Sequence, residues 1–418
     1  MVPLNIAMLT TFYPPYNFGG DGIGIRRLAV ALADRGHTIT VVHDVDAYVT
    51  QAGCEPAPID MDPRITVIGL TSSLGMLSNL LVHQLGRPVF HKARLKELLG
   101  PGKFDVIWHH NVSLVGGPGL FGLGDPHPVR IYEAHEHWLV CPTHVLWKEN
   151  RELCEQRACL KCQLSYKRPP QPWRWTGKLH REARHIDAFI AKSQFSQAKH
   201  RAFGFKPAME VVPYFLPDMP PITGQAAPHP RPYFLFVGRL EKIKGVQDII
   251  PAFAGSAKDG PDLVIVGAGE YEAELRVQAA GMTRVHFTGR LEPEAIPAWY
   301  QNARALIVPS LCYETFGIIL IEAFRSGTPV IARRLGPFPE IIAKGGGLMF
   351  EGVDDLRAAI AELGTDPARR DTLAREARFA YENNWREDIV ITEYLDVVRK
   401  AARAKGNQHV ISALGDIS

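Results

Sequence analysis

Two carboxylates that stand eight positions apart, Glu314 and Glu322, are the residues best suited by type and spacing to bind a ligand. An apolar segment typical of a buried strand precedes Glu314, and the segment after Phe316 predicts a helix that ends near Gly327. Glu314 is therefore expected on a strand-to-helix loop, and Glu322 about two turns into the helix on roughly the same face. The free N–H groups at a helix start can hold an anion. Buried carboxylates beside an anion site favour hydroxyl-rich ligands that carry phosphate, such as nucleotide sugars.

Two cations follow another predicted strand, Tyr233–Val237. Arg239 lies at the carboxyl end of that strand, where open α/β sheets bind ligands, and Lys244 lies at the start of the next helix. Together they can neutralise two phosphates without a metal ion. Each motif has a simpler interpretation, as loop cations or as carboxylates on a helix surface. Because the helix that carries Glu322 is apolar almost all round, a carboxylate there needs a partner, which favours the functional interpretation.

A pair of glycines, Gly19 and Gly20, separates the first predicted strand, Leu4–Thr10, from a helix predicted at Ile23–Arg35. Glycine allows a backbone to approach a phosphate or sugar closely. The pair does not match the dinucleotide fingerprint, so NAD is not favoured. A tight turn is the alternative interpretation.

Strands and helices alternate along the chain, which predicts two doubly wound α/β domains with mainly parallel sheets and a cleft between them. We expect a first domain at residues 1–215 with an insert at 138–185, a linker at 216–231, a second domain at 232–385, and a C-terminal helix at 386–418 that packs back on the first domain. The predicted strands are Leu4–Thr10, Thr38–His43, Ile65–Gly69, Val106–His110, Val129–Glu133, Ala188–Ala191, Tyr233–Val237, Leu263–Val266, Val285–Thr288, Ala305–Val308 and Pro329–Ala332.

Composition restricts the class of protein. The chain has 418 residues, of which 46% are hydrophobic and 22% charged, as in soluble globular proteins. A net charge of +3 gives no reason to expect nucleic acid as a main ligand. Met1 leads directly into a strand, and no apolar run is long enough for a membrane span, so a cytoplasmic location is expected.

Four of the six cysteines, Cys141, Cys154, Cys159 and Cys162, have the spacing C-x12-C-x4-C-x2-C. Four thiolates with a terminal C-x2-C predict a tetrahedral structural zinc site. Few apolar residues lie near the last three cysteines, so a bound metal would supply stability that a small core cannot. An iron–sulfur cluster, two disulfides or unpaired thiols are the alternatives.

A basic segment at residues 166–184 contains Trp173 and Trp175 among several lysines and arginines. This mixture suits a lipid headgroup interface and could dock a lipid-linked acceptor. The alternative is that the tryptophans pack against the domain and the cations are solvated.

Taken in order, Gly-Gly after the first strand, G-R-x4-K-G after the linker and E-x7-E near the end resemble the GT-B glycosyltransferases of the large retaining family 4. The resemblance covers nearly the whole chain. It implies two Rossmann-like domains, with the nucleotide sugar bound mainly on the C-terminal one and the acceptor mainly on the N-terminal one. It also implies that catalysis needs no metal.

The resemblance assigns a role to each motif. Arg239 and Lys244 would bind the donor diphosphate, Glu314 the hydroxyls of the transferred sugar, and Glu322 the ribose. Gly19 and Gly20 would offer backbone groups to the donor diphosphate. Phe316 and Gly317 would present N–H groups to the sugar and phosphate. Arg290 and Leu291 would lie near the base. The family also has a histidine near the sugar, for which His135 is the best match and His137 the weaker one.

The chemistry expected from these roles is transfer of a sugar from a UDP-, GDP- or ADP-sugar to an acceptor hydroxyl, with retained anomeric configuration. Arg239, Lys244 and the helix start would stabilise the leaving diphosphate. Its oxygen would take the acceptor proton, so no side-chain base is needed. Cell-surface polysaccharide, glycolipid or glycoconjugate synthesis would use such an enzyme, in the cytoplasm or at the inner face of the membrane. A non-catalytic nucleotide-sugar binder and a sugar-nucleotide epimerase of the same fold are the competing interpretations.

Overall fold

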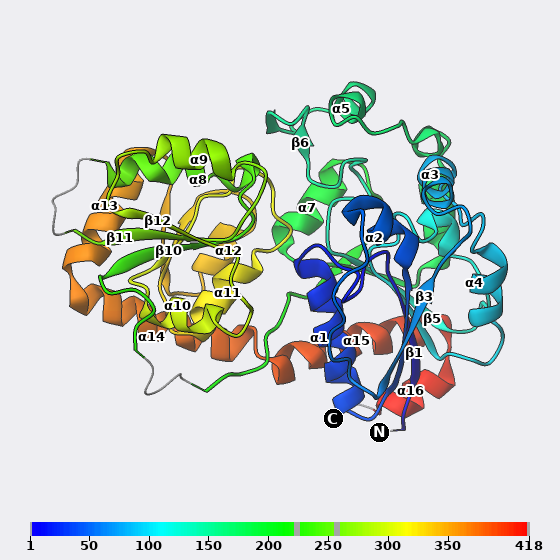
Figure 1. Ribbon diagram of the computed structural model, residues 1–418. Helices are drawn as coiled ribbons and strands as arrows, with labels where there is room; N and C mark the ends of the chain where they lie inside the picture. The colour runs from blue at the N-terminus through cyan, green and yellow to red at the C-terminus, as the bar shows by residue number, and fades with distance from the viewer. Residues whose placement is uncertain (1, 221–225, 255–259, 416–418) are drawn as a thin grey trace. The chain divides into compact units, whose positions relative to one another are not determined.

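The computed structural model describes residues 2–220, 226–254 and 260–415 and divides into two units (Figure 1). The first unit consists of Met1–Pro213 and Val390–Ser418, and the second of Tyr214–Ile389. Part of the predicted linker, residues 221–225, lies outside the described residues. The two sheets are each wound with helices on both faces, and both are parallel throughout. The predicted α/β fold class with two Rossmann-like sheets is confirmed.

The first unit holds a seven-stranded sheet in the order β3-β2-β1-β4-β5-β8-β9. Its strands are β1 (Asn5–Leu9), β2 (Thr38–Asp44), β3 (Ile65–Leu70), β4 (Val106–His109), β5 (Val129–Ala134), β8 (Ala188–Ala191) and β9 (Met209–Val211). A separate hairpin pairs β6 (Trp147–Lys148) with β7 (Glu152–Leu153). The helices are α1 (Gly20–Asp34), α2 (Val45–Ala52), α3 (Met76–Leu85), α4 (Lys92–Leu98), α5 (Cys159–Ser165), α6 (Lys178–Glu182), α7 (Gln194–Ala202) and α16 (Gln408–Leu414).

The second unit holds a six-stranded sheet in the order β12-β11-β10-β13-β14-β15. Its strands are β10 (Tyr233–Val237), β11 (Asp262–Val266), β12 (Val285–Gly289), β13 (Leu306–Val308), β14 (Val330–Arg333) and β15 (Gly347–Phe350). The helices are α8 (Val246–Ile249), α9 (Glu272–Gln278), α10 (Ile296–Asn302), α11 (Ile318–Arg325), α12 (Phe338–Ile342), α13 (Val353–Thr365) and α14 (Pro367–Asn384). Helix α15 (Glu387–Lys405) begins in this unit, and its residues from Val390 onward belong to the first unit.

Alternating side chains of β10 show why this sheet is covered on both faces. Leu235 and Val237 belong to a core cluster with α11 and α14, whereas Phe234 and Phe236 belong to a second cluster with α8, α9 and α13. Successive residues of a strand point to opposite faces, so a continuous apolar strand needs helices on both sides.

Three expectations about local structure are corrected. Helix α1 begins at Gly20 rather than at Ile23. Glu322 is the fifth residue of α11, just over one turn from its start, because the left-handed Gly317 delays the helix to Ile318. Strands β9 and β15 and the β6–β7 hairpin were not predicted.

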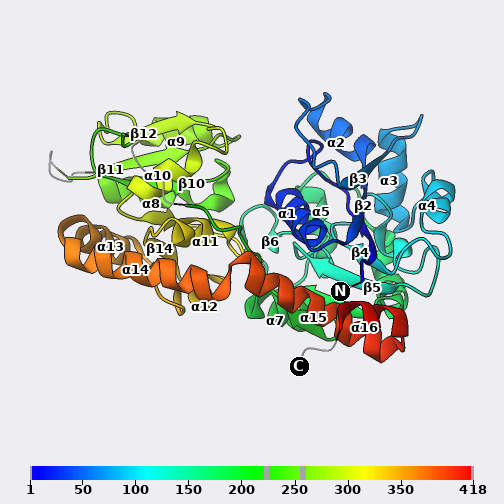
Figure 2. The same ribbon diagram turned by 90° about the horizontal axis from the view of Figure 1, so that it is seen from below.

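In the first unit, α16 lies beside the amino-terminal end of the chain (Figure 2). The Val2 N–H donates a hydrogen bond of 3.2 Å to the Ala413 carbonyl there. The C-terminal helices thus pack on the first unit through direct backbone contact.

Candidate functional site

The candidate donor site lies where the strand order of the second sheet reverses. Strand β10 is paired with β11 on one side and with β13 on the other. At such a switch point the loops that leave the two central strands diverge, and open α/β sheets bind ligands there. The loop after β10 carries Arg239 and Lys244, and the loop after β13 carries Glu314. The structure therefore brings together cations and a carboxylate about seventy positions apart in the chain.

Lys244 and Glu314 form a direct ion pair. The Lys244 Nζ lies 2.6 Å from Glu314 Oε1, and the side chains are 21% and 25% exposed. Ser310 donates a second hydrogen bond of 3.2 Å to the same oxygen. Burial alone would raise the pKa of Glu314, but the Lys244 ammonium and the Ser310 hydroxyl lower it. Burial would lower the pKa of Lys244, yet the Glu314 carboxylate raises it. Both groups are therefore charged at neutral pH.

Arg239 is the more exposed cation of this site. Its Nη1 lies 2.6 Å from Glu241 Oε1, and 60% of its side chain is exposed. An exposed ion pair of this kind contributes little to stability. The guanidinium can therefore turn toward an anion at little cost to the fold.

Helix α11 starts beside this pair with a glycine that the geometry requires. Gly317 has a φ of 110°, and a Cβ there would lie 2.7 Å from a ring carbon of Phe338. No side chain caps the helix start. Because uncapped N–H groups at a helix start attract anions, this end of α11 fits a phosphate or sugar oxygen. Phe316, one position earlier, is buried in the core.

Glu322 has a partner that no sequence motif indicated. The Tyr300 hydroxyl donates a hydrogen bond of 3.0 Å to Glu322 Oε2. Burial, with the Glu322 charge beside it, raises the pKa of Tyr300 well above its usual value, so it acts as a donor. Neither Glu314 nor Glu322 is fully buried, contrary to the expectation from the apolar helix. Both carboxylates keep an accessible side that a ligand can reach.

Arg290 and Leu291 follow β12 in the same unit. Arg290 is exposed, and Leu291 is half-buried against the core cluster of α11. The structure places both residues after a strand of the sheet that also carries Arg239.

In the first unit, the glycine pair after β1 is not needed for a tight turn. Gly19 has an extended backbone, with a φ of −149°, and Gly20 is the first residue of α1. A Cβ at Gly20 would meet no atom within 4 Å. Since neither backbone strain nor packing demands glycine here, the open space at Gly20 favours the interpretation as a surface for ligand approach.

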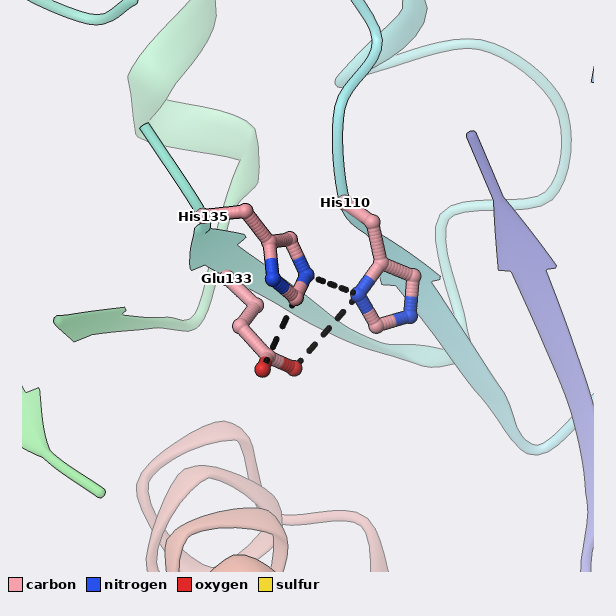
Figure 3. A group of neighbouring side chains, drawn as sticks. All are labelled: His110, Glu133 and His135. Atoms are coloured by element: carbon pink, nitrogen blue, oxygen red, sulfur yellow. Dashed lines mark hydrogen bonds and ion pairs between the residues drawn. The ribbon is translucent and has the colours of Figure 1, made fainter. Parts of the chain in front are cut away.

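His135 belongs to a buried network at the carboxyl edge of the first sheet, together with His110 and Glu133 (Figure 3). The His110 Nδ1 and His135 Nε2 atoms are 2.9 Å apart, so one ring donates a hydrogen bond to the other. Glu133 lies 3.4 Å from His110 and 3.7 Å from His135. All three side chains are almost completely buried.

Two further residues, Lys192 and Tyr394, compensate the charge of Glu133. Lys192 forms an ion pair with Glu133 Oε1, and the Tyr394 hydroxyl donates a hydrogen bond of 2.8 Å to the same oxygen. Burial would raise the pKa of Glu133, but chiefly Lys192 lowers it to about 2. Burial lowers the pKa of His110 to about 3 and that of His135 to about 4.

The network is therefore a hydrogen-bonded group of two neutral histidines over a compensated ion pair. Although its three ligand atoms lie close enough for a metal ion, the Lys192 ammonium already balances the carboxylate. His137, the weaker match to the family histidine, instead lies beside His200, with 5.3 Å between the ring centroids and the rings tilted by 38°.

The cysteine insert follows His135 directly. All six cysteines are free thiols, and Cys141, Cys154, Cys159 and Cys162 line a single small cavity. In the basic segment that follows, Trp173 is buried and donates a hydrogen bond of 2.9 Å to the His83 carbonyl, whereas Trp175 is exposed. Trp173 therefore fits the interpretation that the tryptophans pack against the domain, whereas Trp175 fits the interpretation of a lipid interface.

Two family models match the chain in tandem. Glycosyltransferase Family 4 matches residues 18–216, and Glycosyl transferases group 1 matches residues 223–379. A D-inositol 3-phosphate glycosyltransferase of Kribbella flavida is 27% identical over 398 residues, which are 86% of each chain. One of Pseudarthrobacter chlorophenolicus is 33% identical over 173 residues, which are 38% of this chain and 41% of that relative.

Solved structures have the same fold. Sucrose-phosphate synthase from Thermosynechococcus elongatus matches with a TM-score of 0.72 at 21% identity, covering 96% of this chain and 100% of its own. Anabaena Alr3699/HepE in complex with UDP and glucose matches with a TM-score of 0.65 at 17% identity, covering 95% of this chain and 100% of its own. From its sequence and its fold together, the chain belongs to the GT-B glycosyltransferases of group 1 and family 4.

Proposed function

We propose that this protein transfers a sugar from a nucleotide-diphosphate sugar to an acceptor hydroxyl, in the synthesis of a cell-surface polysaccharide, glycolipid or glycoconjugate. The observation that carries the proposal is the Lys244–Glu314 pair beside Arg239 at the switch point of the second sheet. Two cations suit a diphosphate, and a carboxylate with one accessible side suits sugar hydroxyls. Family membership supports the same reaction class.

In this proposal, each residue acts on a different part of the donor. Arg239, Lys244 and the start of α11 stabilise the negative charge that grows on the diphosphate as the sugar–phosphate bond breaks. Glu314 holds hydroxyls of the transferred sugar, and its lowered pKa keeps it an acceptor rather than an acid. Glu322, oriented by Tyr300, holds the ribose hydroxyls. For Gly20 and His135, the resemblance to family 4 supports a role in donor binding.

The expected stereochemical outcome is retention. The departing phosphate oxygen accepts the proton of the acceptor hydroxyl on the face that the phosphate leaves. No side chain then serves as a general base, and no metal takes part in transfer; a metal on the four cysteines would have a structural role. Proton NMR of the first-formed product tests retention, and an inverted linkage would refute it.

The first property to determine is which nucleotide base the donor carries. One relative, from Corynebacterium glutamicum, is described as GDP-mannose-dependent, whereas Alr3699/HepE was solved with UDP. A thermal-shift screen of UDP-, GDP- and ADP-sugars identifies the base, because a ligand that binds the folded state raises the melting temperature. The screen would count against the proposal if none of these donors shifted the melting temperature.

Arg239→Ala separates an enzyme from a non-catalytic binder. An enzyme is expected to lose transfer and donor hydrolysis in this variant while it keeps its melting temperature, because Arg239 is exposed. Wild-type protein that binds a donor but neither hydrolyses it nor transfers its sugar would favour the binder. Formation of an epimerised sugar nucleotide without an acceptor would favour the epimerase.

We also propose peripheral contact with anionic lipid through the basic segment at residues 166–184, together with the exposed leucines of α5 that precede it. No helix in the part of the chain that the structure describes has the length and apolar character needed to span a membrane. Trp175, Leu160 and Leu164 are 60%, 49% and 59% exposed beside a basic segment. Apolar side chains next to cations suit a headgroup interface.

Flotation with vesicles that contain phosphatidylserine tests this contact. A Leu164→Ser, Trp175→Ser variant is expected to float less than wild type, and Phe379→Ser, an exposed apolar residue of the second unit, serves as the matched control. Wild-type protein that remains in the dense fraction would refute the contact and leave a cytoplasmic location.

A further inference from the structure

The four cysteines of the insert converge on one cavity. Cys141, Cys154, Cys159 and Cys162 all line it, and its free volume is about 10 Å³. That volume holds about one water-sized particle. Cys141, Cys154 and Cys162 are buried, and Cys159 is partly buried. Cysteines from four separate positions of the chain thus share one small cavity, whose wall also includes Lys148 and Arg157.

Cationic side chains lie beside the four cysteines. Lys148 and Arg157 line the same cavity. Arg157 and Arg174 line a neighbouring cavity together with Cys159, and Arg174 lies over the Trp173 ring, 4.4 Å from its centroid. These cations can offset the negative charge of a thiolate complex.

The backbone of the insert takes conformations that side chains disfavour. Among the described residues, every non-glycine residue with positive φ lies in this insert: His144, Leu146, Glu149, Asn150 and Lys167. Two of them form the turn of the β6–β7 hairpin, and the Glu149 N–H there donates a hydrogen bond of 3.3 Å to the Cys162 sulfur. Such conformations persist only where the surroundings hold them.

The insert lies outside the core cluster of the first unit that includes Val140 and Trp173. Leu146 and Trp147 are buried, but none of residues 141–172 belongs to that cluster. Helix α5 has seven residues, and β6 and β7 have two each. Elements this short are not stable without tertiary packing.

We propose that the four cysteines bind one structural zinc ion. Cys159 and Cys162, the C-x2-C pair on α5, would supply two ligands, and Cys141 and Cys154 the other two. Four thiols and one Zn²⁺ would give a tetrathiolate with a charge of −2 and release four protons, and Arg157 and Arg174 would offset that charge. Among the described residues, three groups of side chains have ligand atoms within 4.8 Å of one another, and these cysteines are not among them. The sulfurs must therefore move inward when zinc binds.

The zinc ion would also support the segment that follows His135. The Cys141 N–H donates a hydrogen bond of 2.8 Å to the His137 carbonyl, and Arg174 Nη2 donates one of 2.8 Å to the Trp138 carbonyl. Metal loss is therefore expected to reduce sugar transfer.

The test is metal analysis of the full-length protein, purified without an affinity tag that binds metal. We expect one zinc per chain by mass spectrometry of the metal, and at least a fivefold lower content in Cys154→Ser. Cys54→Ser changes an exposed cysteine outside the insert and should keep the full zinc content. If Cys154→Ser does not fold, titration of the Cys54→Ser variant with a mercurial should release one zinc to a chromogenic chelator as the four thiols of the insert react.

Three results would overturn the assignment. Metal-free protein with four thiols that react with Ellman's reagent would exclude a metal, and loss of those thiols to two disulfides would exclude it as well. Stoichiometric iron with visible absorption would assign the cysteines to an iron centre instead. None of these readouts depends on glycosyltransferase activity, so failure of the zinc proposal is distinguishable from failure of the proposed function.

Discussion

The carboxyl edges of the two sheets have similar topology, but the charged side chains there are partly or mostly exposed in the second unit and buried in the first. In the second unit, the Lys244–Glu314 pair is partly exposed and Arg239 is mostly exposed. In the first unit, Glu133 and Lys192 form an ion pair that is almost completely shielded from solvent, under two neutral histidines. An exposed pair is stabilised only weakly and can exchange its partners for a ligand. A buried pair cannot, because each charge would be left without compensation.

This comparison indicates a division of roles. In the second unit, the charges proposed to bind the donor are partly or mostly exposed and can change partners. In the first unit, the position of His135 depends on Glu133, which forms a buried ion pair with Lys192. Substitutions at the edge of the second sheet should therefore reduce activity, whereas substitutions at the edge of the first sheet should reduce stability.

The largest effect is expected for Glu133→Gln. This change leaves the Lys192 ammonium buried without its carboxylate and should lower the free energy of unfolding by about 3–5 kcal/mol. Urea denaturation measures it. The double variant Glu133→Gln, Lys192→Met removes both charges and should lose less than the sum of the two single variants. A loss below about 1 kcal/mol for Glu133→Gln would show that the pair is not buried in solution.

Lys244→Ala is the corresponding change at the exposed pair. Loss of one preorganised cation at the leaving group should reduce kcat by about 100- to 1000-fold. The melting temperature should change little, because the pair is partly exposed. Lys242→Ala, an exposed lysine two positions away, is the control and should keep full activity. Equal activity of both variants would remove Lys244 from the chemistry.

The third prediction concerns how the stability of the first unit depends on pH. The pKa values of His110 and His135 are lowered by burial to about 3 and about 4. Below pH 6.5 the unfolded chain then binds more protons than the folded one, so stability is present above that pH and is lost as pH falls toward 4. Each histidine contributes a slope of about 1.4 kcal/mol per pH unit.

Urea denaturation between pH 7.5 and pH 5 measures this slope. The range stays above the pKa of ordinary carboxyl groups, which therefore contribute little. Replacing His110 with asparagine should reduce the slope by one proton. An unchanged slope would mean that His110 is accessible to water in the folded protein.

The smallest effect is expected for Tyr300→Phe. This variant removes the hydrogen bond to Glu322, whose carboxylate can bind water instead. A loss of about 1 kcal/mol in donor binding, or about a fivefold rise in Kd, is expected. Isothermal titration with the preferred donor measures it. An unchanged Kd would argue that Glu322 does not bind the ribose.

The motifs of the candidate donor site could be located from the sequence because each one is local in sequence. Arg239 directly follows a buried strand, and Glu314 precedes a helix that begins with an obligatory glycine. The apolar runs of the larger strands likewise indicated two parallel sheets, since only sheets covered on both faces tolerate such runs. The spacing of the four cysteines belongs to the same kind of signal.

The partners of these residues could not be predicted in the same way. Ser310 and Tyr300 lie in segments whose patterns indicate only a strand end and a helix. Tyr394 reaches Glu133 from 261 positions away, through a helix that begins in the other unit.

The sequence by itself determined the fold class and the positions of the candidate donor motifs and of the four clustered cysteines, because propensity and periodicity act over a few residues. Only the tertiary structure decided that Glu314 is paired, that Gly20 is open, and that His135 rests on a buried ion pair. The physical reason is that burial and charge compensation depend on which elements pack together, and packing joins residues without regard to their distance along the chain.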